Sequence, residues 1–286
     1  MAADPPLLHD DNLFAARDVT YLREIQYATI DKLSARILLH SKYSVSKIDW
    51  FTWLRSQIEW SAFESVLEVG CGTGILWSTL PPSAHERLRL VLADLSPSMV
   101  ESSIKQIHPR LSNVTGLVAN VQTLPFENAS FDLVIANQML YHAFDPAAAL
   151  AEIHRVLRPG GVLLASTIGP RHLLELFEIE AMVLGRTLAR SHAEVFGSIS
   201  GRELLAERFD HVEWRAFDDE LLCTNTDDVV AYLTSTPPGE SATTEELQQL
   251  REEIERRRRR GHGVLRVTKD SGTFIARRTF RRDRTF

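Results

Sequence analysis

The sequence predicts an α/β fold in which helices cover both faces of a mostly parallel sheet. An apolar run over residues 66–69 indicates a buried strand, and glycines follow it at alternate positions, Gly70, Gly72 and Gly74. From residue 89 to residue 167, short apolar strands alternate with segments of helical periodicity. Parallel neighbours need a crossover helix between them, so this alternation favours a parallel sheet.

Composition narrows the class of protein. The 286 residues fit one domain with additions, and a hydrophobic content of 44% is ordinary for a soluble globular protein. No apolar run approaches the roughly 20 residues of a membrane span, and the N-terminus lacks the pattern of a signal peptide. The two cysteines, Cys71 and Cys223, make no disulfide framework, which favours a cytoplasmic protein. A net charge of −6 argues against nucleic acid as a partner.

Two helices are expected before the first strand, over residues 17–40 and 47–59. They lie outside a minimal nucleotide-binding core. Residues 1–60 are therefore predicted to form an N-terminal helical extension or lid, and residues 61–286 the core. An N-terminal helix outside the core could pack on a neighbouring subunit, so a homo-oligomer is expected.

Several side chains of the first helix could face a site. Tyr21 and Tyr27 are six residues apart and lie on different sides of the helix, so one could face a ligand. Each could equally be a core residue whose hydroxyl reaches solvent. Arg36 and His40 share a face by their spacing. They could meet the carboxylate of a bound amino acid moiety or make ordinary surface contacts.

The glycine loop carries the strongest signal. A strand that breaks into such a loop before a helix places backbone N–H groups around a nucleotide-like ligand. The dinucleotide fingerprint has its third glycine one position later, where Ile75 stands. Here the spacing is Gly70, Gly72 and Gly74, with Glu68 two residues before the first glycine. This stretch resembles the first motif of class I S-adenosylmethionine (SAM)-dependent methyltransferases, although a similar triplet can serve as a tight turn alone.

Downstream residues fit that resemblance. Asp94 directly follows the predicted strand 89–93 and lies 20 residues past Gly74, where a carboxylate can accept both hydroxyls of a ribose. Asp94 could instead cap the N-terminus of the next helix. Leu95 and Met99 could cover the adenine.

The third strand, residues 114–119, ends at Asn120 and Val121. In the methyltransferases that this chain resembles, an aspartate commonly stands at the position of Asn120 and binds the adenine amino group. An asparagine carbonyl can still accept that hydrogen bond. The Val121 N–H could serve a ring nitrogen, and Asn120 could instead cap a turn.

The fourth strand, residues 130–137, resembles the central strand of the family, which puts Asn137 and Gln138 beside the reactive methyl. His142 is five residues past Asn137. Imidazole has an ordinary pKa near neutrality, so His142 is the candidate base. A structural role for this histidine is an equal alternative.

The C-terminal part is expected to complete the sheet. A helix over residues 171–190 and the connection to residue 200 fall where related enzymes insert a lid. Residues 264–268 and 273–278 are predicted to form a hairpin around a turn at residues 270–272. The resemblance then implies a Rossmann-like, seven-stranded, mostly parallel sheet with a helical lid insertion at about 171–200.

The resemblance implies an enzyme, a SAM-dependent methyltransferase acting on a small molecule, with SAM as cofactor and S-adenosylhomocysteine (SAH) as product. No metal site is predicted. The assigned catalytic residues are Tyr21 and His142. The assigned cofactor-binding residues are Glu68, Gly70, Cys71, Gly72, Gly74, Asp94, Leu95, Met99, Asn120, Val121, Asn137 and Gln138. The assigned substrate-pocket residues are Tyr27, Trp50, Trp53, Tyr141 and Phe177.

The aromatic content favours one kind of acceptor. Methylation of a prenyl double bond generates a carbocation, which aromatic faces stabilise. In its aromatic residues and its additional N-terminal helix with Tyr21, the chain is similar to natural-product C-methyltransferases of the teleocidin-pathway type. In those enzymes, ring closure follows methylation. C-methylation is thus favoured over O- or N-methylation. The alternatives are a SAM-binding sensor or partner subunit without transfer activity and, less favoured, an NAD-dependent oxidoreductase.

Overall fold

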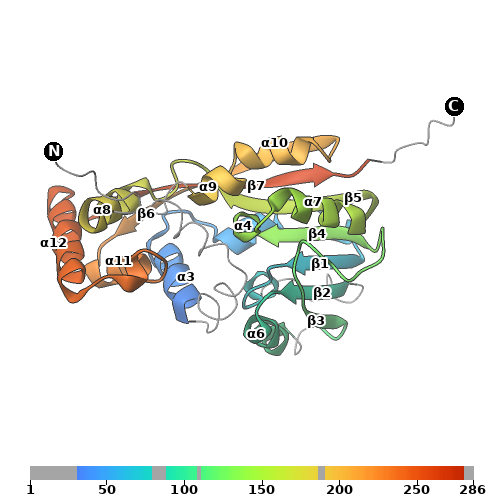
Figure 1. Cartoon of the computed structure of the whole chain (residues 1–286), viewed down its shortest axis with the longest axis horizontal. Coiled ribbons are helices and arrows are strands. Elements are labelled where there is room, and N and C mark those ends of the chain that lie inside the picture. Colours follow the sequence, from blue (N-terminus) through green and yellow to red (C-terminus); the bar gives the residue numbers. More distant parts are fainter. Residues whose placement is uncertain (1–30, 79–87, 108–110, 186–190, 280–286) are drawn as a thin grey trace, which may run out of the picture.

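The computed structural model describes residues 31–78, 88–107, 111–185 and 191–279. Its centre is a seven-stranded sheet of order β3-β2-β1-β4-β5-β7-β6 (Figure 1). The strands are β1 (Ser65–Val69), β2 (Arg89–Asp94), β3 (Val114–Val118), β4 (Phe131–Asn137), β5 (Leu157–Ile168), β6 (His211–Cys223) and β7 (Leu265–Arg277). Strands β1 to β5 are parallel, and β7 is antiparallel to both of its neighbours. The predicted Rossmann-like α/β fold is confirmed.

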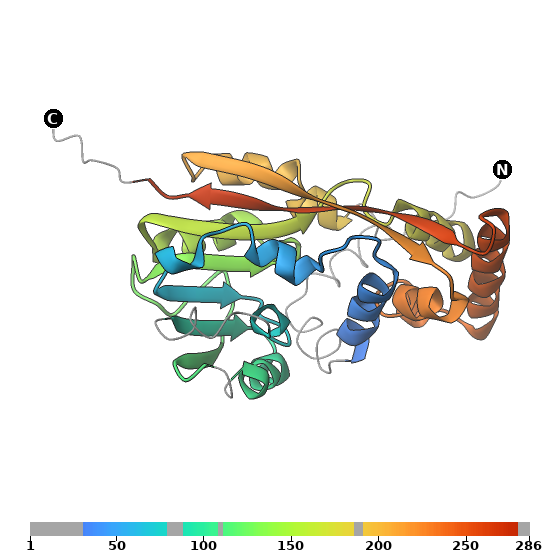
Figure 2. The same cartoon turned by 180° about the vertical axis from the view of Figure 1, so that it is seen from behind.

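Helices lie on both faces of this sheet and at one end of it (Figures 1 and 2). They are α3 (Asp31–Tyr43), α4 (Trp50–Arg55), α6 (Pro97–Ile107), α7 (Pro146–Val156), α8 (Leu174–Leu184), α9 (Ser191–Phe196), α10 (Ser200–Ala206), α11 (Thr226–Leu233) and α12 (Thr244–Arg260). Within the ranges given above, no helix combines the length and the apolarity that a membrane crossing requires.

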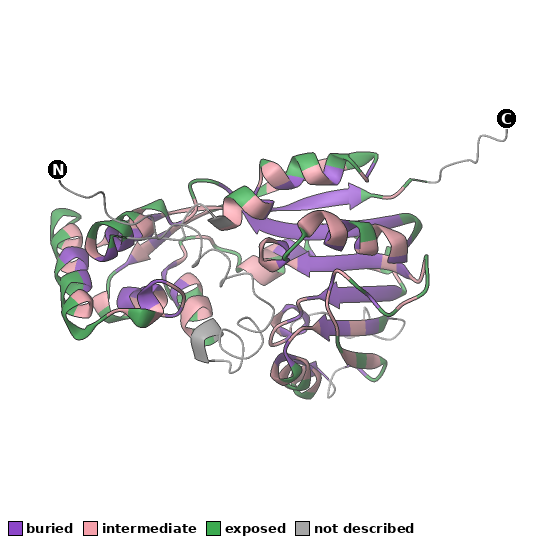
Figure 3. Ribbon diagram, viewed as in Figure 1, coloured by how far each residue is buried: buried purple, intermediate pink, exposed green. Residues whose placement is uncertain are grey.

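The core has one apolar cluster on each face of the parallel strands. Successive strand residues point to opposite faces, so Leu67 belongs to the cluster under α7, whereas Val66 belongs to the cluster under α4. All five residues of β1 are buried (Figure 3). Burying one such aliphatic side chain contributes about 1.5–3 kcal/mol. The central strands are therefore a rigid base for the loops at their carboxyl ends.

The β6–β7 ribbon extends well beyond the rest of the sheet. Strand β7 pairs with β5 only from residue 271 to residue 277, but it pairs with β6 along its whole length. Residues 218–223 and 265–270 thus form a two-stranded ribbon past the carboxyl end of β5, on which α3, α8, α11 and α12 pack (Figure 2). A third apolar cluster, which includes Leu39 of α3 and Leu250 of α12, holds this ribbon and its helices together.

The predicted hairpin in this segment is wrong. Asp270, Ser271 and Gly272 continue the strand instead of turning, because β6 supplies a paired neighbour at each of these positions. A turn signal in the sequence is overridden when a partner strand satisfies the backbone.

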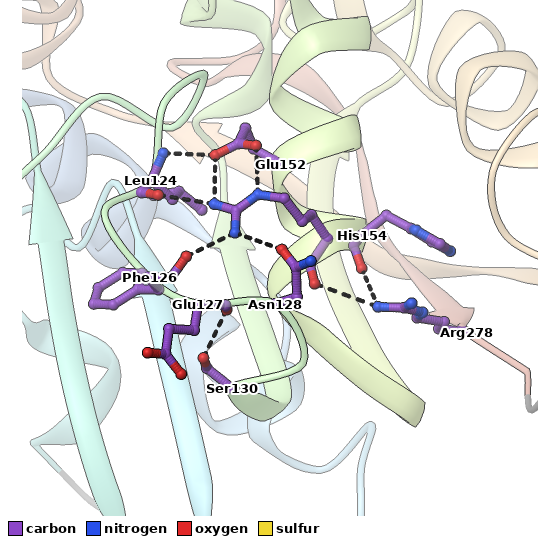
Figure 4. Close-up of polar contacts among 9 residues, drawn as sticks. Leu124, Phe126, Glu127, Asn128, Ser130, Glu152, His154 and Arg278 are labelled. Atoms are coloured by element: carbon purple, nitrogen blue, oxygen red, sulfur yellow. Dashed lines mark hydrogen bonds and ion pairs between the residues drawn. The ribbon is translucent and has the colours of Figure 1, made fainter.

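An arginine of α7 fixes the loop between β3 and β4 (Figure 4). Arg155 donates to the carbonyl oxygens of Leu124 (2.9 Å) and Phe126 (2.6 Å), and it pairs with Glu152 at 2.7 Å. Glu152 in turn accepts from the Leu124 N–H at 2.8 Å. Charge-assisted hydrogen bonds of this kind hold a loop in one conformation. The start of the same loop forms part of the site described next.

The predicted N-terminal extension is described from residue 31 onward. Helix α3 packs with the helices of the ribbon, and Ser44 forms a bridge with Leu221 of β6. Helix α4 packs against the sheet. Tyr21 and Tyr27 lie outside the described residues.

Candidate functional site

A cavity of about 510 Å³ opens at the carboxyl ends of the parallel strands and reaches to the β6–β7 ribbon. Its size is typical of small-ligand sites. Ligands bind at this edge of open α/β sheets, because the loops that follow the strands meet there. The predicted cofactor residues that line it are Gly70, Cys71, Gly72, Asp94, Leu95, Met99, Asn120, Val121, Asn137 and Gln138. The predicted catalytic and pocket residues that line it are Trp50, Tyr141, His142 and Phe177.

The glycine loop needs its glycines for backbone and packing reasons. Gly70, Gly72 and Gly74 have φ values of 66°, 53° and 75°, in the region that other residues rarely adopt. A Cβ on Gly70 would lie 2.7 Å from the side chain of Met139. A Cβ on Gly74 would lie 2.8 Å from Ile107 of α6. Gly74 does not line the cavity, and its missing side chain lets α6 approach the loop.

Glu68 lies behind the glycine loop and does not line the cavity. Its carboxyl group is buried, and one oxygen accepts a hydrogen bond from the indole N–H of Trp77 at 2.5 Å. Burial raises the pKa of Glu68 from 4.5 to about 8, against the lowering effect of the Trp77 hydrogen bond. In the structure, this carboxyl therefore supports the loop from the protein interior.

The raised pKa predicts a pH-dependent stability. The folded chain keeps the Glu68 proton that the unfolded chain releases above pH 4.5, so stability is lost as the pH rises toward about 8. Glu68→Gln does not titrate and can still accept from Trp77. The difference in unfolding free energy between the two proteins should change by up to about 1.4 kcal/mol per pH unit in this window. Urea unfolding at a series of pH values measures it, and parallel profiles for the two proteins would contradict the assignment.

Asp94 joins the glycine loop to the end of β2. Its Oδ2 accepts from the Gly72 N–H at 3.0 Å and its Oδ1 from the Ser96 N–H at 2.9 Å. Burial raises the pKa of this carboxyl, while the two backbone hydrogen bonds act in the opposite direction. Each carboxylate oxygen can accept a further hydrogen bond, so both remain able to meet a ligand hydroxyl.

Asn120 caps a turn, which is the alternative noted for it from the sequence. Its Oδ1 accepts from the Gln122 N–H at 2.9 Å. Asn120 and Val121 nevertheless both line the cavity. An amide oxygen has a second lone pair and its nitrogen two donors, so capping does not exhaust the side chain.

The end of β4 is held in a strained conformation beside the cavity. The Asn137 Oδ1 accepts from the Ser166 hydroxyl at 2.6 Å and from the Trp50 indole N–H at 3.2 Å. Gln138 has a φ of 53°, and its N–H donates to the carbonyl oxygen and the hydroxyl of Ser166, both at 3.1 Å. Strained backbone that its surroundings hold in place is common at functional sites. Trp50 thereby ties α4 to the carboxyl edge of the parallel strands.

Three rings form a compact group on the cavity wall after β4. The ring of Tyr141 lies 4.6 Å from that of His142 and 4.8 Å from that of His192, and the two imidazoles are 5.2 Å apart. His192 belongs to α9 and was not singled out in the sequence, because no local pattern reports a contact between α9 and the loop after β4. Trp53 does not line the cavity; it packs against Trp50 and Phe217.

The part of the cavity next to the ribbon is polar. Arg36 and His40 of α3 both line it, as their shared helix face suggested. Lys269 and Ser271 of β7 and His172 before α8 line it as well. No motif marks these last three positions, which come together only through the packing of the ribbon.

The strand order, the positive-φ glycine loop and the acid after β2 define an α/β nucleotide-binding domain of the class I methyltransferase type. Residues 67–165 match the family model described as a methyltransferase domain. Residues 67–165 thus form a methyltransferase domain by this match, and SAM is the cofactor of such domains.

Proteins that are named as methyltransferases are similar to this chain in sequence or in fold. A malonyl-[acyl-carrier protein] O-methyltransferase of Hahella chejuensis is 42% identical over 113 residues, 40% of this chain and 39% of that protein. The ubiquinone/menaquinone biosynthesis C-methyltransferase UbiE of Shewanella frigidimarina is 31% identical over 161 residues, 54% of this chain and 64% of that protein. Phosphoethanolamine N-methyltransferase 2 of Haemonchus contortus, solved with SAM, has a TM-score of 0.55 at 16% identity, covering 92% of this chain and 60% of that one. The last comparison shows a shared fold.

The matches span less than two thirds of the length of both curated relatives. The family match over residues 67–165 covers the glycine loop and most of the five parallel strands, and the ligand of such folds binds at the carboxyl ends of these strands. The rest of the cavity, lined by residues of α3, α8, α9 and the ribbon, lies outside the family match.

Proposed function

We propose that the protein transfers the methyl group of SAM to a small molecule bound in the same cavity. One observation carries the proposal: a single cavity joins the edge formed by Gly72 and Asp94 to a wall formed by Tyr141, His142 and Phe177. Cofactor and acceptor can then occupy one enclosed space, as a direct transfer requires.

The assigned roles follow the lining of the cavity. Gly70 and Gly72 hold the amino acid part of SAM and Asp94 its ribose. Asn120 and Val121 meet the edge of the adenine. Leu95, Met99 and the backbone around Asn137 complete the binding surface, with Met99 fully buried at the adenine end.

The chemistry needs little from the protein beyond placement. The sulfonium of SAM already activates the methyl, and orientation of the acceptor can supply on the order of 7–11 kcal/mol at best. The acceptor must still lose a proton, before transfer at oxygen or nitrogen and after it at carbon. His142 is the group we propose for that step, since it lines the cavity five residues after Asn137. Tyr21 stays a sequence-based candidate.

For the acceptor, we propose a prenyl-type secondary metabolite that is methylated at carbon, with or without ring closure. The aromatic faces of Trp50, Tyr141 and Phe177 on the cavity wall support it. The pair of imidazoles, His142 and His192, supports the competing O- or N-methylation. Incubation with methyl-labelled SAM and a small-molecule cell extract tests both, because mass spectrometry of the labelled product locates the new methyl.

The same incubation separates catalysis from SAM sensing. A sensor or partner subunit would bind SAM and label nothing in the extract. A labelled small molecule supports the transferase, and its absence across extracts would favour the sensor.

SAH should raise the melting temperature of the protein, and NAD should not. Only a ligand that binds the folded state stabilises it, by RT ln(1 + [L]/Kd), which is about 2.7 kcal/mol at a hundredfold excess over Kd. Differential scanning fluorimetry with SAM, SAH and NAD measures the shift. A shift with NAD and none with SAH would instead support an oxidoreductase.

We also propose a lid and an oligomer. Helices α8 and α9 fall in the expected insertion at 171–200, and Phe177 and His192 of these helices line the cavity. The extension over residues 1–60 supplies Arg36, His40 and Trp50 to the same cavity. Homo-oligomer formation through the N-terminal helix and a cytoplasmic location stay predictions. Sedimentation of the chain with and without residues 1–40 tests the first.

A further inference from the structure

Strand β6 is the last strand on its side of the sheet in the described part of the chain (Figure 2). An edge strand presents backbone N–H and C=O groups that can pair with another strand. Near its carboxyl end this edge is covered, because Ser44 forms a bridge with Leu221 and the Val45 N–H donates to the Glu220 carbonyl oxygen at 3.0 Å. These contacts leave the edge open over residues 211–218.

The backbone groups that face away from β7 belong to alternate residues of β6. The Glu220 carbonyl oxygen faces away from β7, since it accepts from the Val45 N–H. The N–H and C=O of one strand residue point to the same side, and the side changes at each residue. The pairing of β6 with β7 has no shift of register. Val212, Trp214 and Ala216 therefore present their N–H and C=O groups at the open edge, where no other described segment hydrogen-bonds to them.

The open stretch lacks the features that most often block an edge strand, which are proline, lysine and bulges. Residues 211–218 contain neither proline nor lysine, and their pairing with β7 is continuous. Glu213 and Arg215 lie on the same face of the strand and pair with each other at 2.8 Å, with side chains that are 43% and 40% exposed. A strand that pairs with this edge must therefore place opposite charges beside these two side chains.

A second copy of β6 meets that requirement in one register. Two copies related by a twofold axis pair antiparallel, so each residue lies opposite a residue of the other copy. An axis at Glu213 or at Arg215 would place that charge opposite itself. With the axis at Trp214, Glu213 of each copy lies opposite Arg215 of the other. Opposite charges directly across from each other stabilise a sheet, as aromatic pairs do, whereas like charges destabilise it.

The backbone favours the same register. Two residues that exchange both hydrogen bonds across an antiparallel pair must each face the other strand. Trp214 opposite itself meets this condition, and so does Val212 opposite Ala216. The next pair beyond residues 211–217 would place Asp218 opposite Asp210, so the pairing ends there. The stretch that can pair is thus centred on Trp214, the residue that the charges select.

We propose that β6 pairs with β6 of a second copy of this chain, with Trp214 on the twofold axis. The two sheets then form one continuous sheet, in which β6 is no longer at an edge. No residue of β6 is among the described residues that line the cavity, so this contact leaves the cavity open. It is a different surface from the N-terminal helix.

Charge reversal in the full chain tests the register. Glu213→Arg or Arg215→Glu alone gives both facing pairs like charges, so each should weaken self-association at least about tenfold. An equimolar mixture of the two variants restores opposite charges at both pairs and should associate about as tightly as the unaltered protein. Glu101→Arg alters an exposed partner of Lys105 on α6 and is the matched control, which should associate normally. Sedimentation velocity over a range of protein concentrations measures the association.

A backbone variant tests the pairing independently of charge. Ala216→Pro removes an outward N–H, and proline is tolerated where the N–H of an edge strand faces solvent. This variant should also weaken self-association, and a cooperative thermal transition shows that it is folded. In the unaltered protein, hydrogen exchange over residues 212–216 should slow as the protein concentration rises, because pairing protects the outward amides.

Three outcomes would overturn the inference. The first is an unaltered protein that stays monomeric at every concentration. The second is self-association that Glu213→Arg leaves unchanged, including an oligomer that depends on residues 1–40 alone. The third is a mixture of Glu213→Arg and Arg215→Glu that associates no better than either variant by itself. None of these outcomes bears on methyl transfer, which is measured separately.

Discussion

Replacement of His142 by alanine is expected to lower kcat for methyl transfer by about 100-fold or more, the usual contribution of a positioned base. The imidazole lines the cavity after β4, against the rings of Tyr141 and His192. Its backbone N–H donates to Met139 at 2.9 Å, which fixes the loop independently of the ring. The substitution should therefore remove the proton acceptor and leave the loop in place. Transfer of labelled methyl to the acceptor found in extract gives kcat, and calorimetry gives the affinity for SAH, which should not change.

Two controls separate a base from a structural histidine. His154 of α7 packs against Phe209 and does not line the cavity, so His154→Ala should keep full turnover. Added imidazole should partly restore the activity of His142→Ala, because it can enter the space that the ring vacates, and would do nothing for a packing defect. Full turnover by His142→Ala would show that the proton leaves to another group.

Replacement of Asp94 by alanine is expected to weaken SAH binding at least about tenfold, and up to about a hundredfold. A hydrogen bond to a charged group contributes about 1.5–3 kcal/mol. The change also removes the acceptor for the N–H groups of Gly72 and Ser96, so the glycine loop loses a contact as well. Titration calorimetry measures the total effect.

A ligand change separates the ribose contact from the effect on the loop. The unaltered protein should prefer SAH over 2′-deoxy-SAH, and Asp94→Ala should lose that preference while loop loosening alone would keep it. Asp145→Ala is the matched control, because this aspartate caps α7 through the Ala148 N–H at 3.0 Å and lies outside the cavity lining. Unchanged SAH affinity in Asp94→Ala would remove the ribose assignment.

The cofactor edge was predictable because its residues directly follow strands. The carboxyl ends of parallel strands meet at one edge of a sheet, so Gly72, Asp94, Asn120 and Asn137 had to lie together once the strands were recognised. Glu68 lies two residues before Gly70, but as a residue of β1 it points into the interior, where it accepts a hydrogen bond from Trp77.

The acceptor side was predicted only in part. Helix spacing put Arg36 and His40 on one face, either for the carboxylate of a bound amino acid moiety or for surface contacts, and both line the end of the cavity beside the ribbon. Trp53 was expected in the pocket but lies behind Trp50, because a helix with aromatics on several sides does not reveal which one faces the cavity. No sequence pattern indicated that Lys269 and His172 would line the cavity.

By itself, the sequence determined the α/β class, the glycine loop and the cofactor edge, since these depend on local periodicity and on residues adjacent to strand ends. Only the tertiary structure decided that residues 265–277 form one strand and that a ribbon carries Lys269 to the far end of the cavity. The physical reason is the separation in sequence of the residues that determine each feature. Backbone conformation at a strand end is set by neighbours in sequence, whereas the β6–β7 pairing and the stacking of His40 on His172 join residues far apart in the chain.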